Sequence, residues 1–205
     1  MPSHTFARVE KKKLPLDDEM QFIRSWIEKP LSTGAVMPSS KALARTMVRY
    51  VDPQSSGPVI ELGPGTGPVT EALVRHGVDP KRLLLVEFNP DFCRLLRKRY
   101  PAATVVQGDA YRLRRLLGAL VREPAAAVVS GLPLVTKPLR TRLRLIADAM
   151  SLLAPGAPFI QFTYGLFSPL ARREFGIEGA LRKRVLGNLP PASVWLYRRP
   201  DPARA

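Results

Sequence analysis

The feature that most constrains the fold is a stretch in which a short apolar run becomes a loop with a glycine at every second position. It runs from Pro58 to Thr70 and reads Pro-Val-Ile-Glu-Leu-Gly-Pro-Gly-Thr-Gly-Pro-Val-Thr. Glycines let the backbone turn sharply and let a ligand lie close against it, because no Cβ stands in the way. Pro68 suits the first turn of a helix, where its missing N–H is not needed. A strand, a glycine turn and a helix in this order predict the nucleotide-binding end of a Rossmann-like unit.

Beyond this loop, apolar runs and amphipathic stretches alternate. Strands are predicted over 82–86, 104–106, 125–129 and 159–164, and helices over 69–76, 91–100, 111–121 and 138–153. Continuous apolar strands separated by helices predict a parallel sheet that is covered on both faces. Residues 182–186 and 193–197 are predicted to add an antiparallel pair, which completes a mostly parallel, seven-stranded α/β sheet. A further helix, capped by Ser39 and Ser40, is predicted to precede the glycine loop.

Composition narrows the kinds of partner. A chain of 205 residues suits one domain, here 31–200, with an N-terminal appendage over 1–30 and a short tail over 201–205. The formal charge of +15 indicates a polyanionic partner, either nucleic acid or an anionic membrane surface, although an arginine-rich composition bias is the alternative. No apolar run reaches the roughly 20 residues of a membrane span, and no signal peptide opens the chain, so we expect a cytoplasmic protein. One cysteine and two distant histidines argue against a disulfide and a metal site.

The N-terminal appendage combines a basic arm with an amphipathic helix. Apolar residues recur at helical spacing between Pro15 and Pro30, which is typical of a helix lying in a membrane interface, although such a face can also pack on its own domain. The lysines before it add about 1 kcal/mol each near an anionic surface. The membrane-binding residues predicted here are Lys11, Lys12, Lys13, Met20, Ile23, Trp26 and Ile27.

The glycine spacing distinguishes between nucleotide cofactors. A dinucleotide-binding loop has its third glycine three residues after the second, and that position is Pro68 here. Glu61, two residues before the first glycine, would repel a pyrophosphate. A carboxylate there suits a ligand with a cationic amine, and S-adenosylmethionine carries both an α-ammonium group and a sulfonium.

Two acidic positions downstream agree with this cofactor. Glu87 follows Gly67 by twenty residues and ends a predicted strand, where a carboxylate can bind ribose hydroxyls. Asp109, in Gly108-Asp109-Ala110, ends the next strand, where it can accept from an adenine amine. This ordered set resembles the class I S-adenosylmethionine-dependent methyltransferases, whose product is S-adenosylhomocysteine. That resemblance implies a Rossmann-like methyltransferase fold.

Two families with similar loops methylate amines. The ribosomal RNA adenine dimethyltransferases carry an Asn-Leu-Pro-Tyr/Phe stretch after the fourth strand, in which the aromatic stacks on a flipped base. This chain has Ser130-Gly131-Leu132-Pro133-Leu134, so the asparagine is replaced and the aromatic is absent. The chain also leaves no room for the C-terminal helical domain of those enzymes. Because the glycine loops are similar, RNA adenine N6-dimethylation remains the alternative function, although these differences make it the less favoured one.

The chain is more similar to the bacterial phospholipid N-methyltransferases, across nearly its whole length. The similarity rests on the amphipathic entry helix, the glycine loop, Gly34-x-x-x-Pro38-Ser39-Ser40-x-x-Leu43, Ser130-Gly131-Leu132-Pro133 and Gln161-Phe162-Thr163-Tyr164-Gly165. It implies stepwise methylation of phosphatidylethanolamine through its mono- and dimethyl forms to phosphatidylcholine, at the inner face of the cytoplasmic membrane. With this family included, the predicted cofactor-binding residues are Ser39, Ser40, Lys41, Glu61, Gly63, Gly65, Gly67, Glu87, Phe88, Gly108, Asp109, Ala110 and Ser130.

The acceptor chemistry suggests further residues. An amine lone pair displaces the methyl group in line, so the protein mainly positions and desolvates the reactants. Methylated ammonium products favour aromatic faces, and the candidates are Tyr164, Phe162 and Trp26. Tyr164 comes first because its hydroxyl can also orient the amine, although it can equally pack in the core, whereas core packing is the favoured interpretation for Phe162. Tyr164, Ser130 and Gly131 are the predicted catalytic residues, and no general base is assigned.

The lipid phosphate requires a cation near the fourth-strand loop. Three basic residues follow that loop and are predicted to bind lipid, although each can also lie on a solvated helix face: Lys137, Arg140 and Arg142. No metal is expected, nucleic acid is the less favoured partner, and the oligomeric state is left open.

Overall fold

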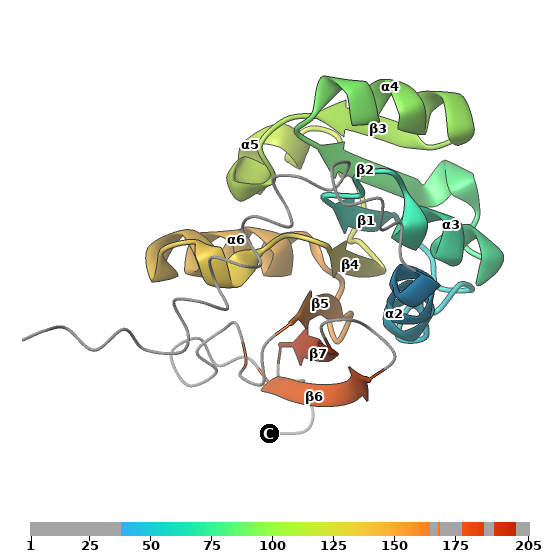
Figure 1. Cartoon of the computed structure of the whole chain (residues 1–205). Helices are drawn as coiled ribbons and strands as arrows, with labels where there is room; N and C mark the ends of the chain where they lie inside the picture. Colours follow the sequence, from blue (N-terminus) through green and yellow to red (C-terminus); the bar gives the residue numbers. More distant parts are fainter. Residues whose placement is uncertain (1–37, 165–167, 169–177, 187–190, 200–205) are drawn as a thin grey trace, which may run out of the picture. The chain divides into compact units, whose positions relative to one another are not determined.

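The computed structural model describes residues 38–164, 168, 178–186 and 191–199 (Figure 1). The chain divides into two compact units, Met1–Ala35 and Val36–Ala205, and every described residue belongs to the second. The predicted arm and amphipathic helix lie outside the described residues, as does the tail over 201–205. The predicted membrane-binding residues of this region therefore also lie outside the described residues: Lys11, Lys12, Lys13, Met20, Ile23, Trp26 and Ile27.

The second unit is built on one seven-stranded sheet with the strand order β3-β2-β1-β4-β5-β7-β6. In that spatial order the strands are β3 (Thr104–Gln107), β2 (Leu83–Glu87), β1 (Val59–Leu62), β4 (Ala127–Ser130), β5 (Phe159–Thr163), β7 (Ala192–Arg198) and β6 (Glu178–Val185). The first five are parallel, whereas β7 is antiparallel to both β5 and β6. The sequence-based prediction of a mostly parallel sheet that ends in an antiparallel pair is thereby confirmed.

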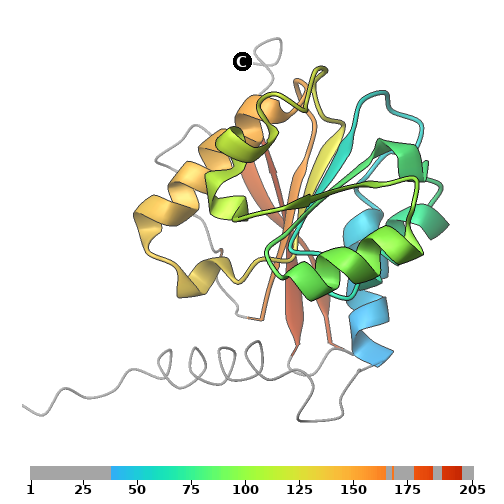
Figure 2. The same cartoon turned by 90° about the horizontal axis from the view of Figure 1, so that it is seen from above.

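Helices cover both faces of this sheet. They are α2 (Pro38–Val48), α3 (Pro68–Arg75), α4 (Pro90–Arg99), α5 (Leu113–Leu117) and α6 (Leu139–Leu152), with short 3₁₀ turns η1 (Pro80–Arg82), η2 (Ala110–Arg112) and η3 (Leu134–Thr136). Figures 1 and 2 show α2, α3 and α4 on one face and α5 and α6 on the other. Side chains alternate along β1, so Val59 packs with the first group and Ile60 with the second.

Two local predictions differ from the structure. The helix predicted over 111–121 is divided into η2 and the short α5, because the backbone of Arg112 between them is not helical, with φ −117° and ψ 39°, and α5 ends at Leu117. Ser39 and Ser40 were predicted to cap α2, but the helix begins at Pro38, so both residues lie in its first turn. A proline is well suited to that first turn. None of the described helices has the length and apolar character that a membrane crossing requires.

Candidate active site

The glycine loop joins β1 to α3 in a left-handed backbone conformation. Gly65 has φ +57°, and a Cβ built on it would meet no atom within 4 Å. The loop is held from both sides, since the Gly63 N–H donates to the Val86 carbonyl and the Gly67 N–H to the Pro64 carbonyl, each at 2.9 Å. The space above Gly65 is therefore free for a ligand that lies against the backbone.

Glu87 ties this loop to the end of β2. It is 7% exposed, and its Oε2 accepts from the Gly65 N–H at 2.9 Å while Oε1 accepts from the Asn89 N–H at 2.8 Å. A carboxylate oxygen has a second acceptor position, so these bonds leave Glu87 able to accept from ribose hydroxyls as well. The structure thus adds a loop-positioning role that the sequence did not indicate.

A cavity of about 320 Å³ lies at the carboxyl ends of the neighbouring strands. Six of the predicted cofactor-binding residues line it, together with four further residues. The lining consists of Gly63, Glu87, Phe88, Gly108, Asp109 and Ala110, and of Val86, Tyr111, Leu132 and Lys137. Phe88 is 75% exposed, which leaves its ring available for stacking. Asp109 Oδ1 accepts from the Tyr111 N–H at 3.0 Å. The strand-end residues that the sequence placed at one edge do meet here.

Tyr111 is a residue of this cavity that the sequence-based prediction missed. Its hydroxyl is buried and has no hydrogen-bond partner among the described residues. Burial, and next the charge of Asp109, raises the pKa of Tyr111 to about 12, so the hydroxyl remains a donor at neutral pH. Lys137 Nζ lies 5.2 Å from the centre of the ring. A buried donor without an acceptor fits a ligand that brings one, such as the ribose or adenine of the predicted cofactor.

Glu61 lies near the glycine loop but does not line the cavity. The side chain is 2% exposed, and its Oε2 accepts from the Thr70 hydroxyl at 2.7 Å. Burial raises the pKa of Glu61 to about 8, with the neighbouring charge of Glu87 adding to the effect. The carboxyl is therefore largely neutral at pH 7, and a cationic ligand nearby would favour its ionised form.

The loop after β4 is pressed against the glycine loop. The Gly131 N–H donates to the Leu62 carbonyl at 2.8 Å, and a Cβ on Gly131 would stand only 3.0 Å from the Gly63 carbonyl oxygen. Ser130 is fully buried, and its hydroxyl accepts from the Leu132 N–H at 3.4 Å. The two predicted catalytic residues of this loop thus lie directly beside the predicted cofactor loop.

Gln161 holds the same loop from the neighbouring strand. It is the register partner of Ser130 and is fully buried. Its Nε2 donates to the Leu132 carbonyl at 2.9 Å and to the Phe162 carbonyl at 2.7 Å, whereas its buried Oε1 has no partner among the described residues. A glutamine inside an apolar strand was the sequence signal for this role.

The remaining predicted residues lie elsewhere. Tyr164 is half-buried and stands edge-to-face with Phe162, ring centres 5.3 Å apart, packed against the core on the α2 face. It does not line the cavity. Arg140 and Arg142 lie in the first turn of α6, also outside the lining, so Lys137 is the predicted lipid-binding cation that the structure brings to the cavity.

Lys41 lines a separate groove between α2 and α3, which has no lining residue in common with the cavity and borders the glycine loop through Thr66. Within the described ranges, no three His, Cys, Asp or Glu side chains gather in a way that could hold a metal ion.

Comparison with known proteins finds a relative that matches almost from end to end. The chain is 32% identical over 189 residues to an ornithine lipid N-methyltransferase from Singulisphaera acidiphila, covering 89% of this chain and 97% of that protein. Among solved structures, the N-methyltransferase NodS from Bradyrhizobium japonicum, in complex with S-adenosyl-L-homocysteine, superposes with a TM-score of 0.65 at 15% identity. The superposition covers 88% of this chain and 98% of NodS, and it confirms the predicted fold.

Matches to ribosomal RNA methyltransferases are partial. The family model described as ribosomal RNA adenine dimethylase matches residues 38–118. Ribosomal RNA small subunit methyltransferase A from a Synechococcus strain is 35% identical over 96 residues, which is 45% of this chain and 31% of that protein. Ribosomal RNA small subunit methyltransferase A from Anaeromyxobacter dehalogenans is 30% identical over 181 residues, which is 80% of this chain and 62% of that protein. The family-model match includes the glycine loop and the cavity acids.

Proposed function

We propose that this chain, which belongs to the family of the ornithine lipid N-methyltransferase among the class I S-adenosylmethionine-dependent methyltransferases, methylates the primary amine of a membrane lipid. The observation that carries the proposal is the match to that relative over 97% of its length. By contrast, the chain spans 31% and 62% of the lengths of the two ribosomal RNA methyltransferases described above.

The residues present fit S-adenosylmethionine, the cofactor of this class. Glu87 and Asp109 offer carboxylate acceptors, Tyr111 offers a buried donor, and Gly65 leaves its face of the loop open. When bound, the cofactor supplies a methyl group on a sulfonium, which is reactive toward amines. The chain itself positions and orients the reactants.

The acceptor that we propose is phosphatidylethanolamine, methylated stepwise to phosphatidylcholine. An ornithine head group resembles it chemically, since both carry a primary amine and an anionic group, a phosphate in one and a carboxylate in the other. Lys137 at the cavity supplies a cation for that anionic group. The amine reacts as the free base, so its proton is first released to solvent. We place this reaction at the inner face of the cytoplasmic membrane.

The second candidate, RNA adenine N6-dimethylation, is favoured by the family model that matches residues 38–118. The loop after β4 argues against it. Leu134 occupies the position at which those enzymes are expected to carry a stacking aromatic, and it is 1% exposed within the core under α6. A base that leaves its helix requires an accessible stacking surface, and a buried leucine does not provide one.

A methyl-transfer assay tests the proposal. The protein is incubated with S-adenosylmethionine labelled in its methyl group and with vesicles of phosphatidylethanolamine, vesicles containing ornithine lipid, or ribosomal RNA. We expect the label to appear in lipid. The order in which label appears in the mono-, di- and trimethyl products shows whether transfer is stepwise. Glu87→Ala should abolish transfer, whereas Glu123→Ala, on an exposed loop, should not. Label in RNA alone would contradict the proposal.

A further inference from the structure

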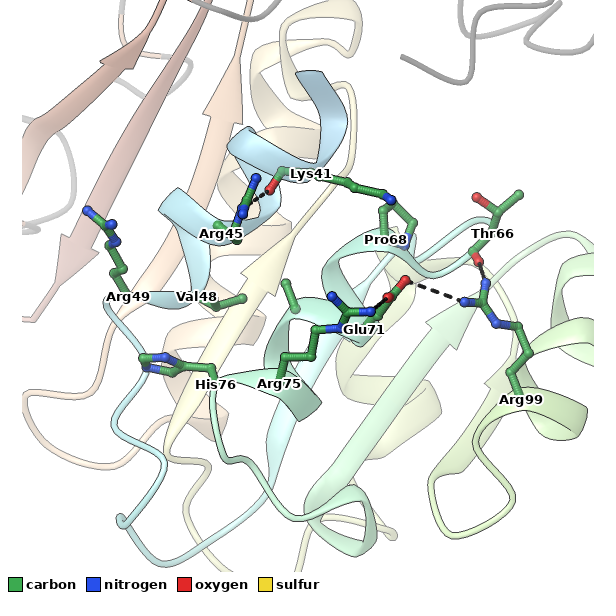
Figure 3. A pocket seen from close by; sticks show the side chains of 11 residues that line it. Lys41, Arg45, Val48, Arg49, Thr66, Pro68, Glu71, Arg75, His76 and Arg99 are labelled. Atoms are coloured by element: carbon green, nitrogen blue, oxygen red, sulfur yellow. Dashed lines mark hydrogen bonds and ion pairs between the residues drawn. The ribbon is translucent and has the colours of Figure 1, made fainter. Parts of the chain in front are cut away.

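A second hollow, distinct from the candidate active site, runs between α2 and α3. It encloses about 440 Å³, and Figure 3 shows its walls. Basic side chains predominate among the residues that line it. They are Lys41, Arg45, Arg49, Arg75 and Arg99, with Val48, Thr66, Pro68, Glu71, Ala72 and His76.

The α2 wall carries a row of uncompensated cations. Lys41 and Arg45 lie one turn apart on α2, and Arg49 follows directly after the helix ends at Val48. The three cations form one stripe at four-residue spacing, and all three are exposed. No carboxylate of the described residues pairs with them, and the Arg45 Nε–H donates only to the Lys41 carbonyl, at 3.3 Å. Like charges along one stripe repel each other, so an anion in the groove would relieve that repulsion.

The opposite wall does not neutralise this stripe. Glu71 is the sole carboxylate in the lining, and it already pairs with Arg75 at 2.6 Å and with Arg99 at 3.6 Å. Arg99 is also held in place by its donation to the Thr66 carbonyl at 2.7 Å. Figure 3 shows these interactions across the groove from Lys41, which extends from α2 toward Pro68.

The floor of the groove is apolar. Val48 and Ala72 are 3% and 8% exposed, and Pro68 closes the end at the glycine loop. The lining holds no Phe, Tyr or Trp, and the ring of His76 is engaged by its contact with the Val51 carbonyl at 3.0 Å. Single-stranded nucleic acid needs aromatic faces on which its bases stack, and this groove does not offer them. Cations above an apolar floor instead match a phosphate attached to an apolar body.

We propose that this groove binds the phosphate of an anionic phospholipid at the membrane surface and so docks the enzyme beside its substrate. The inference rests on the proposed lipid function. One end of the groove, lined by Lys41, Thr66 and Pro68, borders the glycine loop, so a lipid that fills the groove reaches the edge of the sheet that carries the active-site cavity. Guanidinium groups bind phosphate through paired hydrogen bonds, which suits Arg45 and Arg49 as the principal ligands.

The test measures vesicle binding by the full chain. Arg45→Gln with Arg49→Gln removes two cations from the groove. Lys81→Gln with Arg122→Gln removes the same charge from exposed positions at the amino ends of the strands. On phosphatidylcholine vesicles containing phosphatidylglycerol, we expect the groove variant to bind roughly 25-fold more weakly and the control pair to bind nearly as wild type. Unchanged affinity for S-adenosylhomocysteine shows that the variants are folded.

Three outcomes would overturn the inference. They are equal weakening by both pairs of substitutions, no weakening by the groove pair, or a groove variant that loses affinity for ribosomal RNA while keeping its affinity for vesicles. Methyl transfer by the wild type is measured separately on vesicles of the same composition to which phosphatidylethanolamine has been added as the acceptor. If the wild type transfers no methyl group while the groove variant still binds vesicles more weakly, the proposed function is refuted but the inference about the docking groove stands.

Discussion

The buried carboxyl of Glu61 gives the protein a distinctive dependence of stability on pH. In the folded chain its pKa is raised from 4.5 to about 8, chiefly by burial. In the unfolded chain the carboxyl is solvated and ionises near 4.5. Between these values the folded state binds more protons than the unfolded state, so the free energy of unfolding falls as pH rises. Glu61→Gln removes the titration while nearly preserving the shape of the side chain.

The magnitude follows from the two pKa values. A displacement from 4.5 to about 8 corresponds to about 5 kcal/mol in total, at about 1.4 kcal/mol for each tenfold change in proton affinity. Part of this free-energy change falls below pH 5 or above pH 8. Between pH 5 and pH 8, Glu61 accounts for a loss of about 3–4 kcal/mol in the free energy of unfolding. Domains are stable by about 5–15 kcal/mol, so a change of this size is readily measured.

Urea unfolding at pH 5 and pH 8 provides the measurement. The loss of unfolding free energy from pH 5 to pH 8 should be smaller for Glu61→Gln than for wild type by about 3–4 kcal/mol. Glu123→Gln makes the same chemical change on an exposed loop and should follow the wild type. If Glu61→Gln and wild type lose the same free energy, Glu61 is already ionised in the folded protein and the reasoning is refuted.

Other residues give independent expectations. The α-ammonium of S-adenosylhomocysteine favours ionised Glu61, so its binding should release a proton and should tighten as the pH rises toward about 8. Calorimetry in buffers of different ionisation enthalpy measures the proton release, and a value of zero would contradict this expectation. Gly65→Ala should cost about 1–2 kcal/mol in thermal unfolding because φ is +57°, and should also weaken binding of S-adenosylhomocysteine because the new Cβ enters the open space. Tyr111→Phe should leave thermal stability unchanged or slightly higher, since it removes an unpartnered hydroxyl, but weaken cofactor binding about tenfold; equal binding would show that the hydroxyl meets no ligand atom. Gln161→Leu removes the side-chain donor to the Leu132 carbonyl, so it should lower kcat about tenfold with little change in the dissociation constant of S-adenosylhomocysteine. A change in that constant instead would place the role of Gln161 at the cofactor.

Features encoded locally were predictable from the sequence. The glycine loop and the strand-end acids follow from a short pattern and from the rule that parallel strands present their carboxyl ends at one edge. Glu87 and Asp109 accordingly meet at one cavity. The position of Lys41 was less predictable, because its direction depends on the packing of α2 beside α3 rather than on its own motif.

Features that depend on distant contacts were missed. The Gln161 side chain reaches the Leu132 carbonyl across 29 positions, and no local pattern encodes that distance. The Tyr111 hydroxyl is a candidate ligand-binding group because it is buried away from water and has no hydrogen-bond acceptor among the described residues. Both properties depend on the tertiary structure, so the sequence alone does not indicate them. The membrane role of residues 1–30 stays a prediction, as does the catalytic role of Tyr164.

The close approach of Gly131 to the Gly63 carbonyl has a consequence for protein engineering. Any side chain at position 131 would have to push one backbone segment away from the other, since the first atom beyond Cα already stands 3.0 Å from that oxygen. Libraries that aim to change the acceptor should therefore leave this glycine unchanged. Leu132, whose side chain lines the cavity, is the next position of the loop and the first at which size and polarity can be varied productively.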